Sequence, residues 1–143
     1  MLAAITPADY PEVVDVWEAS VRATHHFITE DDIQTFKPLI LNQYLDMVDL
    51  FGIRDETGRL LGFLGVADHK VEMLFLHPDA RGKGLGRIFM NHAINTLGAT
   101  KVDVNEDNPQ AVGFYQHLGF RTVGRSELDP NGNPYPILHL ELV

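Results

Sequence analysis

The spacing of apolar residues predicts helices in the first third of the chain and a strand-rich remainder. A short apolar run predicts a first strand, and apolar side chains then recur at helical spacing in two stretches; these segments are residues 2–5, 10–24 and 33–47. Asp9 and Glu12 match a capping box at the start of the first helix, and residues 29–32 mark the start of the second. Pro38 is expected to kink or split this second helix, because proline has no backbone N–H to donate.

From residue 49 onwards the pattern is mainly extended, with two further helices between the strands. Apolar segments predict strands at residues 50–53, 60–66, 71–76, 101–104, 121–127 and 137–142. Turn signals at residues 55–58 and 129–132 predict two hairpins, and helical spacing predicts helices at residues 85–97 and 109–118. The expected fold is α+β in α/β/α layers, with a mixed, largely antiparallel sheet and helices on both faces.

The size of the chain predicts one domain. It has 143 residues, 45% of them hydrophobic, which is enough for one compact core and too few for two ordinary ones. We therefore expect a single domain over residues 1–143. The absence of cysteine excludes disulfides, thiolate metal sites and a cysteine nucleophile. The N-terminus resembles neither a signal peptide nor a membrane span, so a cytoplasmic location is the default expectation.

Acidic residues outnumber basic ones. Eleven Lys and Arg against twenty Asp and Glu give a formal charge of -9, which would repel a polyphosphate backbone, so nucleic acid is not expected as a partner. The same charge favours encounter with cationic substrates such as amines, although an acidic surface also simply keeps proteins soluble. Three of the basic residues nevertheless lie within residues 81–87, interleaved with three glycines.

This glycine-rich segment is the clearest ligand signal. Because it follows a predicted strand and runs into an amphipathic helix, its backbone amides, the helix N-terminus and its three cationic side chains favour an anion, and a diphosphate matches best. A Walker A loop is excluded because Gly86 is followed by Arg87 instead of Lys and Ser or Thr. A dinucleotide fingerprint is excluded because Phe89 stands where its third glycine is needed. The alternative is a glycine-rich turn with solubilising basic residues.

Arg81-x-x-Gly84-x-Gly86 after a strand resembles the cofactor motif of the GNAT acetyltransferase superfamily. Independently, residues 105–120 resemble that superfamily's Asn-x-x-Ala-x-x-Phe-Tyr-x-x-x-Gly-Phe segment, at the expected distance downstream. The resemblance implies a GNAT-like fold, with a mixed, largely antiparallel six- to seven-stranded sheet flanked by about four helices.

Two further segments, residues 20–27 and the tail at residues 124–136, resemble the small bacterial YjaB-like acetyltransferases, which look like candidate protein-lysine acetyltransferases. The resemblance implies an enzyme that transfers the acetyl group of acetyl-CoA directly to a primary amine in a ternary complex. The amine is a protein lysine, a protein N-terminus or a small amine. Two alternatives remain: a non-catalytic coenzyme A-binding sensor or scaffold, and a toxin-type enzyme acting on charged transfer RNA, which the acidic charge disfavours.

The resemblance also implies where the donor binds, because family members hold the pantetheine along the strand that precedes the loop. Tyr115 matches the family's tyrosine general acid, which protonates the leaving thiolate; an ordinary core tyrosine is the alternative. Asn108 matches a cofactor-contacting asparagine, and a cap of the helix that follows is the alternative. The Leu76 amide matches an oxyanion donor. The full set of implied donor-binding residues is Leu74, Phe75, Leu76, Arg81, Gly82, Lys83, Gly84, Leu85, Gly86, Arg87, Asn108 and Tyr115.

The general base stays open among three candidates. Asp103 lies between two valines at a position where some peptide acetyltransferases of the superfamily carry a glutamate. Glu72 shares strand parity with Leu74 and Leu76, where partial burial would raise its pKa. The pair His25 and His26 follows the first helix. For each there is an alternative without chemistry: a salt-bridged strand residue, a surface carboxylate and a helix C-cap, respectively.

The acceptor site is expected near the end of the first helix, because that region lines it in the family. Its predicted residues are Trp17, His25, His26 and Phe27, together with the turn at residues 129–136. The histidines form no recognisable ligand set, so no metal is expected. The predicted partners are acetyl-CoA and the amine, and the protein is expected to be a monomer or a homodimer.

Overall fold

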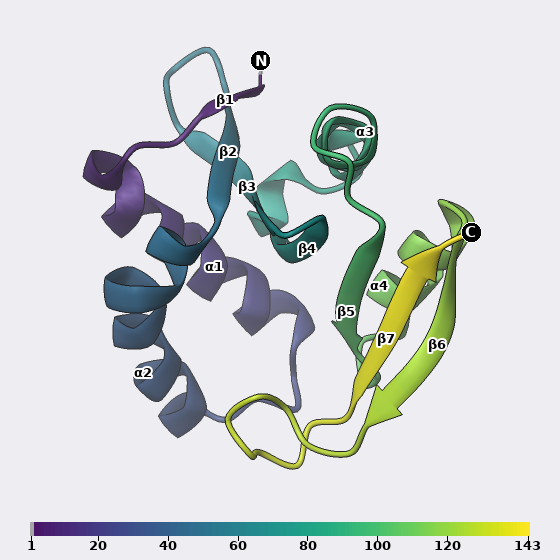
Figure 1. Ribbon diagram of the computed structural model, residues 1–143. Helices are drawn as coiled ribbons and strands as arrows, with labels where there is room; N and C mark the ends of the chain where they lie inside the picture. Colours follow the sequence, from purple (N-terminus) through teal and green to yellow (C-terminus); the bar gives the residue numbers. More distant parts are fainter. Residues whose placement is uncertain (1) are drawn as a thin grey trace. The chain divides into compact units, whose positions relative to one another are not determined.

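The computed structural model describes residues 2–143, which group into two compact units that meet in sequence at Ala99 and Thr100. The first unit contains β1 (Leu2–Ala4), α1 (Tyr10–Thr24), α2 (Glu30–Leu39), β2 (Asp49–Arg54), β3 (Leu60–Ala67), β4 (Lys70–Leu76) and α3 (Leu85–Asn95) (Figure 1). The second contains β5 (Lys101–Asn105), α4 (Pro109–His117), β6 (Phe120–Ser126) and β7 (Ile137–Leu142). The predicted α+β class is confirmed, and each predicted strand and helix is present.

The four strands of the first unit form an antiparallel sheet in the order β1-β2-β3-β4. The hairpin between β2 and β3 turns at Asp55, whose carboxylate accepts hydrogen bonds from the Thr57 and Arg59 amides at 2.9 and 3.0 Å. A bulge between Ile53 and Arg54 shifts the register just before this turn. The predicted turn at residues 55–58 is therefore confirmed.

Helices lie on both faces of this sheet. Successive residues of β3 point to opposite faces, so this one strand contacts helices on each side. Phe63 belongs to a core cluster with the apolar stripes of α1 and α2, and α2 lies beside α1 (Figure 1). A Cβ placed on the neighbouring Gly62 would instead lie 3.2 Å from the ring of Phe89, which belongs to α3. This arrangement matches the predicted α/β/α layering in the first unit.

The second predicted helix is interrupted close to Pro38. The regular α-helix ends at Leu39, a π-helical turn follows over Ile40–Tyr44, and a 3-10 turn over Leu45–Met47 completes the segment. Proline withholds one backbone donor and crowds the preceding turn, so a change of helical period near it is expected. The predicted split is confirmed.

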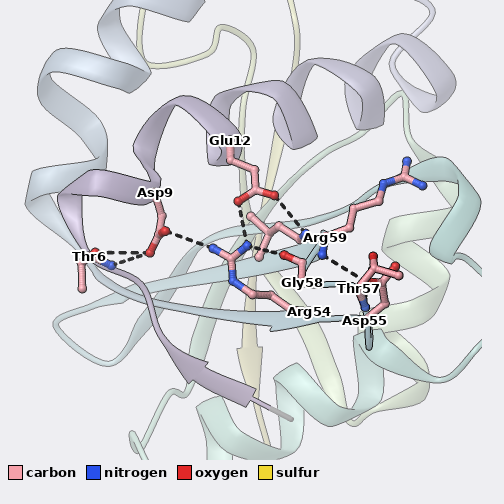
Figure 2. Close-up of polar contacts among 9 residues, drawn as sticks. Thr6, Asp9, Glu12, Arg54, Asp55, Thr57, Gly58 and Arg59 are labelled. Atoms are coloured by element: carbon pink, nitrogen blue, oxygen red, sulfur yellow. Dashed lines mark hydrogen bonds and ion pairs between the residues drawn. The ribbon is translucent and has the colours of Figure 1, made fainter.

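The predicted capping box of Asp9 and Glu12 is wrong, since the Glu12 side chain contacts the sheet (Figure 2). A 3-10 turn precedes α1, and there it is Thr6 that pairs with Asp9, the Thr6 amide donating to its carboxylate at 3.1 Å. Glu12 accepts one hydrogen bond from Arg54 at 2.7 Å and another from the Leu60 amide at 3.1 Å. The carboxylate thus joins α1 to both strands of the β2–β3 hairpin.

The second unit is a three-stranded antiparallel sheet in the order β5-β7-β6, packed against α4. Val102 on β5 pairs with Leu140 on β7, and both are buried. The ring of Phe120 lies 5.9 Å from that of Tyr115, so α4 packs on the same apolar residues. A bulge between Thr122 and Gly124 shifts the register of β6 against β7.

Replacing Glu12 with alanine is expected to lower the free energy of unfolding by about 1–3 kcal/mol, because the amide of Leu60, which is 1% exposed, loses its acceptor. Urea denaturation followed by circular dichroism measures this change. Asp15→Ala is the matched control, since Asp15 lies exposed on the same helix. Equal midpoints and slopes for the two variants would show that the Glu12 bridge does not stabilise the fold.

Candidate active site

The glycine-rich loop connects β4 to α3 through a defined backbone path. After β4, His77 caps a 3-10 turn over Pro78–Ala80, its Nδ1 accepting from the Asp79 amide at 3.1 Å. Gly82 and Gly84 follow with φ of 75° and 76°, the left-handed region that glycine adopts without strain. A Cβ on either residue would meet no atom within 4 Å, so their backbone angles, and not lack of space, require glycine.

The N-terminus of α3, which directly follows the loop, is suited to bind an anion. Gly84 is the N-cap, and the Ile88 amide donates to its carbonyl at 3.2 Å, so the amides of the first turn before Ile88 have no acceptor within the helix. The first turn of α3 carries no acidic side chain. Gly86 lies inside this turn, where it has no need of a left-handed angle. Amides, helix dipole and glycines together form a site suited to a phosphate group.

Arg81 supplies a cation at this site. Its Nε is buried and has no hydrogen-bond partner within residues 2–143, and burial lowers the pKa of its guanidinium below the usual value. An arginine nevertheless keeps its charge, so an unpaired, partly desolvated donor lies beside the loop. Because burying such a group costs free energy unless an anion pairs with it, Arg81 fits a bound diphosphate.

The end of α1 lies close to β4 and to this arginine. The His25 ring is 5.4 Å from the Phe27 ring and 6.3 Å from the Phe75 ring, and its Nδ1 lies 2.8 Å from the Thr24 hydroxyl. Burial, together with the smaller effects of the charges of Arg81 and His26, lowers the pKa of His25 to about 4. The structure therefore brings His25, Phe27 and Phe75 together, with His25 neutral near pH 7 and poorly suited to take a proton from an amine.

Two predicted acceptor residues occupy different environments. Trp17 is 6% exposed and packs edge-on against Phe36 of α2 at 6.4 Å, so its ring lies in the core and not on a binding surface. Its helical spacing with Val13 and Val21 explains this position, because all three belong to the buried stripe of α1. His26 is exposed. The prediction that Trp17 contacts the substrate is corrected to a packing role.

Glu72 is also not where the sequence predicted a base. Its side chain is 40% exposed and lies 3.8 Å from the Lys70 ammonium. The predicted partial burial is therefore absent, because Glu72 follows the buried Val71 and takes the opposite face of β4. Its environment is that of a surface carboxylate in a weak ion pair.

Asp103 has a partner that the sequence analysis missed. The carboxylate lies 2.7 Å from Nδ1 of His139, and Nε2 of the same ring lies 2.7 Å from the Ser126 hydroxyl. The three residues come from β5, β7 and β6, and Asp103 and His139 are directly opposite in the register. The alternation of buried and exposed residues in β5 and β7 indicates that Asp103 and His139 each lie on the less buried face of their strand. The sequence does not give the strand register, so it could not show that the two side chains are directly opposite each other.

Tyr115 and Asn108 lie on α4. Tyr115 is 7% exposed, its ring 5.2 Å from that of Phe114, and burial raises the pKa of the phenol above its ordinary value. It therefore keeps its proton at neutral pH and could donate it. Asn108 is the N-cap of α4, since its Oδ1 accepts from the Ala111 amide at 3.3 Å. The side-chain oxygen of Asn108 therefore caps α4, which agrees with the alternative interpretation of this residue as a helix cap.

A family model for the acetyltransferase (GNAT) domain matches residues 24–135. The peptidyl-lysine N-acetyltransferase YjaB of Escherichia coli (strain K12) is 38% identical over 132 residues, 92% of this chain and 89% of that protein. YjaB of Salmonella typhimurium is 35% identical over 129 residues, 90% of this chain and 88% of that protein. The solution structure of apo YjaB from Escherichia coli superposes with a TM-score of 0.90 at 35% identity, covering 100% of this chain and 97% of that chain, which confirms the predicted GNAT-like fold.

Replacing Arg81 with glutamine is expected to raise the pKa of His25 from about 4, because a positive charge is removed. The pKa should stay below the ordinary 6.5, since burial is the larger cause. Titration of the His25 Hε1 resonance by NMR measures the value. Arg87→Gln is the control, because Arg87 is exposed and does not perturb His25. An unchanged His25 titration in the Arg81 variant would mean that the two side chains are not in electrostatic contact.

Proposed function

Because the chain belongs to the GNAT acetyltransferases, and is therefore an acetyl-CoA-dependent acyltransferase, we propose that it acetylates the ε-amine of lysine in proteins or peptides. Lysine is proposed as the acceptor because nearly the whole chain is similar to two bacterial peptidyl-lysine N-acetyltransferases. The family match crosses the boundary between the two compact units, which supports one GNAT domain over residues 1–143.

The donor-binding proposal rests on the loop after β4. The left-handed glycines, the first-turn amides of α3 and the buried Arg81 Nε would hold the pyrophosphate of acetyl-CoA, with Lys83 and Arg87 adding charge. The backbone of residues 74–76 would hold the pantetheine, and Asn108 and Tyr115 complete the proposed set. No group of three His, Asp or Glu side chains in residues 2–143 is placed to hold a metal ion.

The proposed chemistry is direct transfer without an acyl-enzyme. The amine attacks the thioester carbonyl, the Leu76 amide stabilises the oxyanion, and Tyr115 protonates the leaving thiolate. Burial keeps the proton on the phenol at neutral pH, so Tyr115 has a proton to give when the C–S bond breaks. Among the base candidates, the environments of Glu72 and His25 favour Asp103.

A lysine side chain suits the charge of the protein. The formal charge of -9 attracts a cationic acceptor and repels nucleic acid, which remains an unexpected partner. His25, His26 and Phe27, at the end of α1, are the proposed acceptor contacts, with the turn at residues 129–136.

No helix in residues 2–143 has the length and apolar character needed to cross a bilayer. We place the reaction in the cytoplasm of a bacterium, because the peptidyl-lysine N-acetyltransferases that the chain resembles are bacterial.

Incubation with acetyl-CoA and a lysine-containing peptide is expected to release coenzyme A thiol, with a matching mass increase on the lysine. The same peptide with a blocked N-terminus separates lysine from N-terminal acetylation. Free polyamines and amino acids serve as small-amine controls, and the peptide should have the higher kcat/KM. Faster turnover of a small amine would overturn the peptide assignment, and bound coenzyme A without release for any amine would contradict the whole proposal.

Replacing Tyr115 with phenylalanine should lower kcat by roughly 10²–10⁴-fold while the KM for acetyl-CoA changes little, because the ring still packs and only the proton donor is lost. Steady-state thiol release measures both constants. Tyr44→Phe is the control, since Tyr44 is a partly buried tyrosine outside the proposed site. Similar kcat values for the two variants would assign Tyr115 to packing alone.

A further inference from the structure

The Asp103, His139 and Ser126 side chains form a continuous hydrogen-bonded chain across the three strands of the second unit. Both ring nitrogens of His139 are engaged, at 2.7 Å from the Asp103 carboxylate and 2.7 Å from the Ser126 hydroxyl. Distances this short are typical of strong hydrogen bonds in which one partner is ionised or polarised. The imidazole is therefore held in one orientation by two neighbouring strands.

The chemistry of the three groups fixes the direction of their hydrogen bonds. An ionised carboxylate only accepts, so Nδ1 of His139 must carry the hydrogen that faces Asp103. In the neutral ring Nε2 then has a lone pair, and the Ser126 hydroxyl must donate to it. A proton that arrives at Ser126 can thus pass to Nε2, and the resulting imidazolium would be stabilised by Asp103.

The chain lies on the face of the sheet opposite to its apolar residues. Val102, Val104 and Leu140 are buried, and alternation places Asp103 and His139 on the other face. The His139 side chain is 38% exposed and the Asp103 side chain 31%, which leaves the group reachable from solvent. Ser126 and His139 also flank the turn at residues 129–136, which is part of the proposed acceptor site.

We propose that Ser126, His139 and Asp103 form the proton relay that deprotonates the acceptor amine. This inference rests on the proposed acetyl transfer and deepens it. Ser126 contacts the ammonium and is the catalytic residue, His139 is the base that stores the proton, and Asp103 is a positioning residue that sets the tautomer. The sequence prediction of Asp103 as the base is thereby refined, since it acts through His139.

The relay balances the protons of the reaction. One N–H bond of the substrate ammonium breaks and its proton goes to Ser126 Oγ, while the Ser126 proton goes to His139 Nε2. The neutral amine forms the C–N bond and the C–S bond breaks. Tyr115 gives its proton to the thiolate, and the second proton of the nitrogen replaces it on the phenol. The net proton released is therefore the one on His139, which passes to solvent.

His139→Gln is expected to lower kcat with a lysine peptide by roughly 10²–10⁴-fold, with the KM for acetyl-CoA within about twofold of the unaltered value. Ser126→Ala should lower kcat by about 10–100-fold, whereas Ser126→Thr keeps the hydroxyl and should restore most of the rate. Glu141→Gln is the matched control, because Glu141 shares the face of β7 with His139 but pairs with Lys101. Circular dichroism confirms that each variant is folded.

The tautomer of His139 gives a second readout that does not need turnover. Nitrogen-15 NMR of the unaltered protein should show Nδ1–H, and Asp103→Asn should reduce that population and also lower kcat by roughly 10²-fold. An Nε2–H tautomer, or an unchanged kcat in His139→Gln with peptide acetylation intact, would overturn the relay alone. Absence of thiol release by the unaltered protein with every amine would overturn both the relay and the proposed function.

Discussion

The position of the end of the first unit that is proposed to bind ligands depends on the Glu12 carboxylate. It joins the first turn of α1 to Arg54 and to the Leu60 amide, so the helix is fixed across the β2–β3 hairpin. An α-helix is rigid over the 15 residues of α1, a length of about 22 Å, and anchoring one end therefore sets the position of the other. The other end is His25, beside Phe75 of β4.

Desolvation is the second constraint on this region. Burial lowers the pKa of both His25 and Arg81, and the buried Arg81 Nε has no hydrogen-bond partner within residues 2–143, so the first unit holds a neutral imidazole and an unsatisfied cation close together. A bound diphosphate would pair with the arginine and reduce its field at the histidine. Donor binding at Arg81, as proposed, would therefore be linked to the protonation of His25 through a single charge.

Local signals in the sequence predicted most of the fold, and long-range contacts account for what it did not predict. The helix start at Thr29 and the split near Pro38 depend on neighbouring residues and were correctly predicted. Glu12 has the spacing of a capping box, but its carboxylate finds partners 42 and 48 residues away. Trp17 shows the same limit, because helical spacing cannot distinguish a binding face from a buried one.

The glycine loop was predicted because its chemistry lies within seven consecutive residues, whereas His139 was overlooked because its partners come from two other strands. The bulge between Thr122 and Gly124 adds a further condition. It leaves Val123 unpaired and 60% exposed, and it pairs Gly124 with His139 and Ser126 with Ile137. In a regular ladder of the same length Ser126 would lie opposite residue 136 and point to the other face, so the hydrogen-bonded group depends on the one extra residue that the bulge places in β6. Relatives of this protein should therefore be compared by strand length as well as by residue identity.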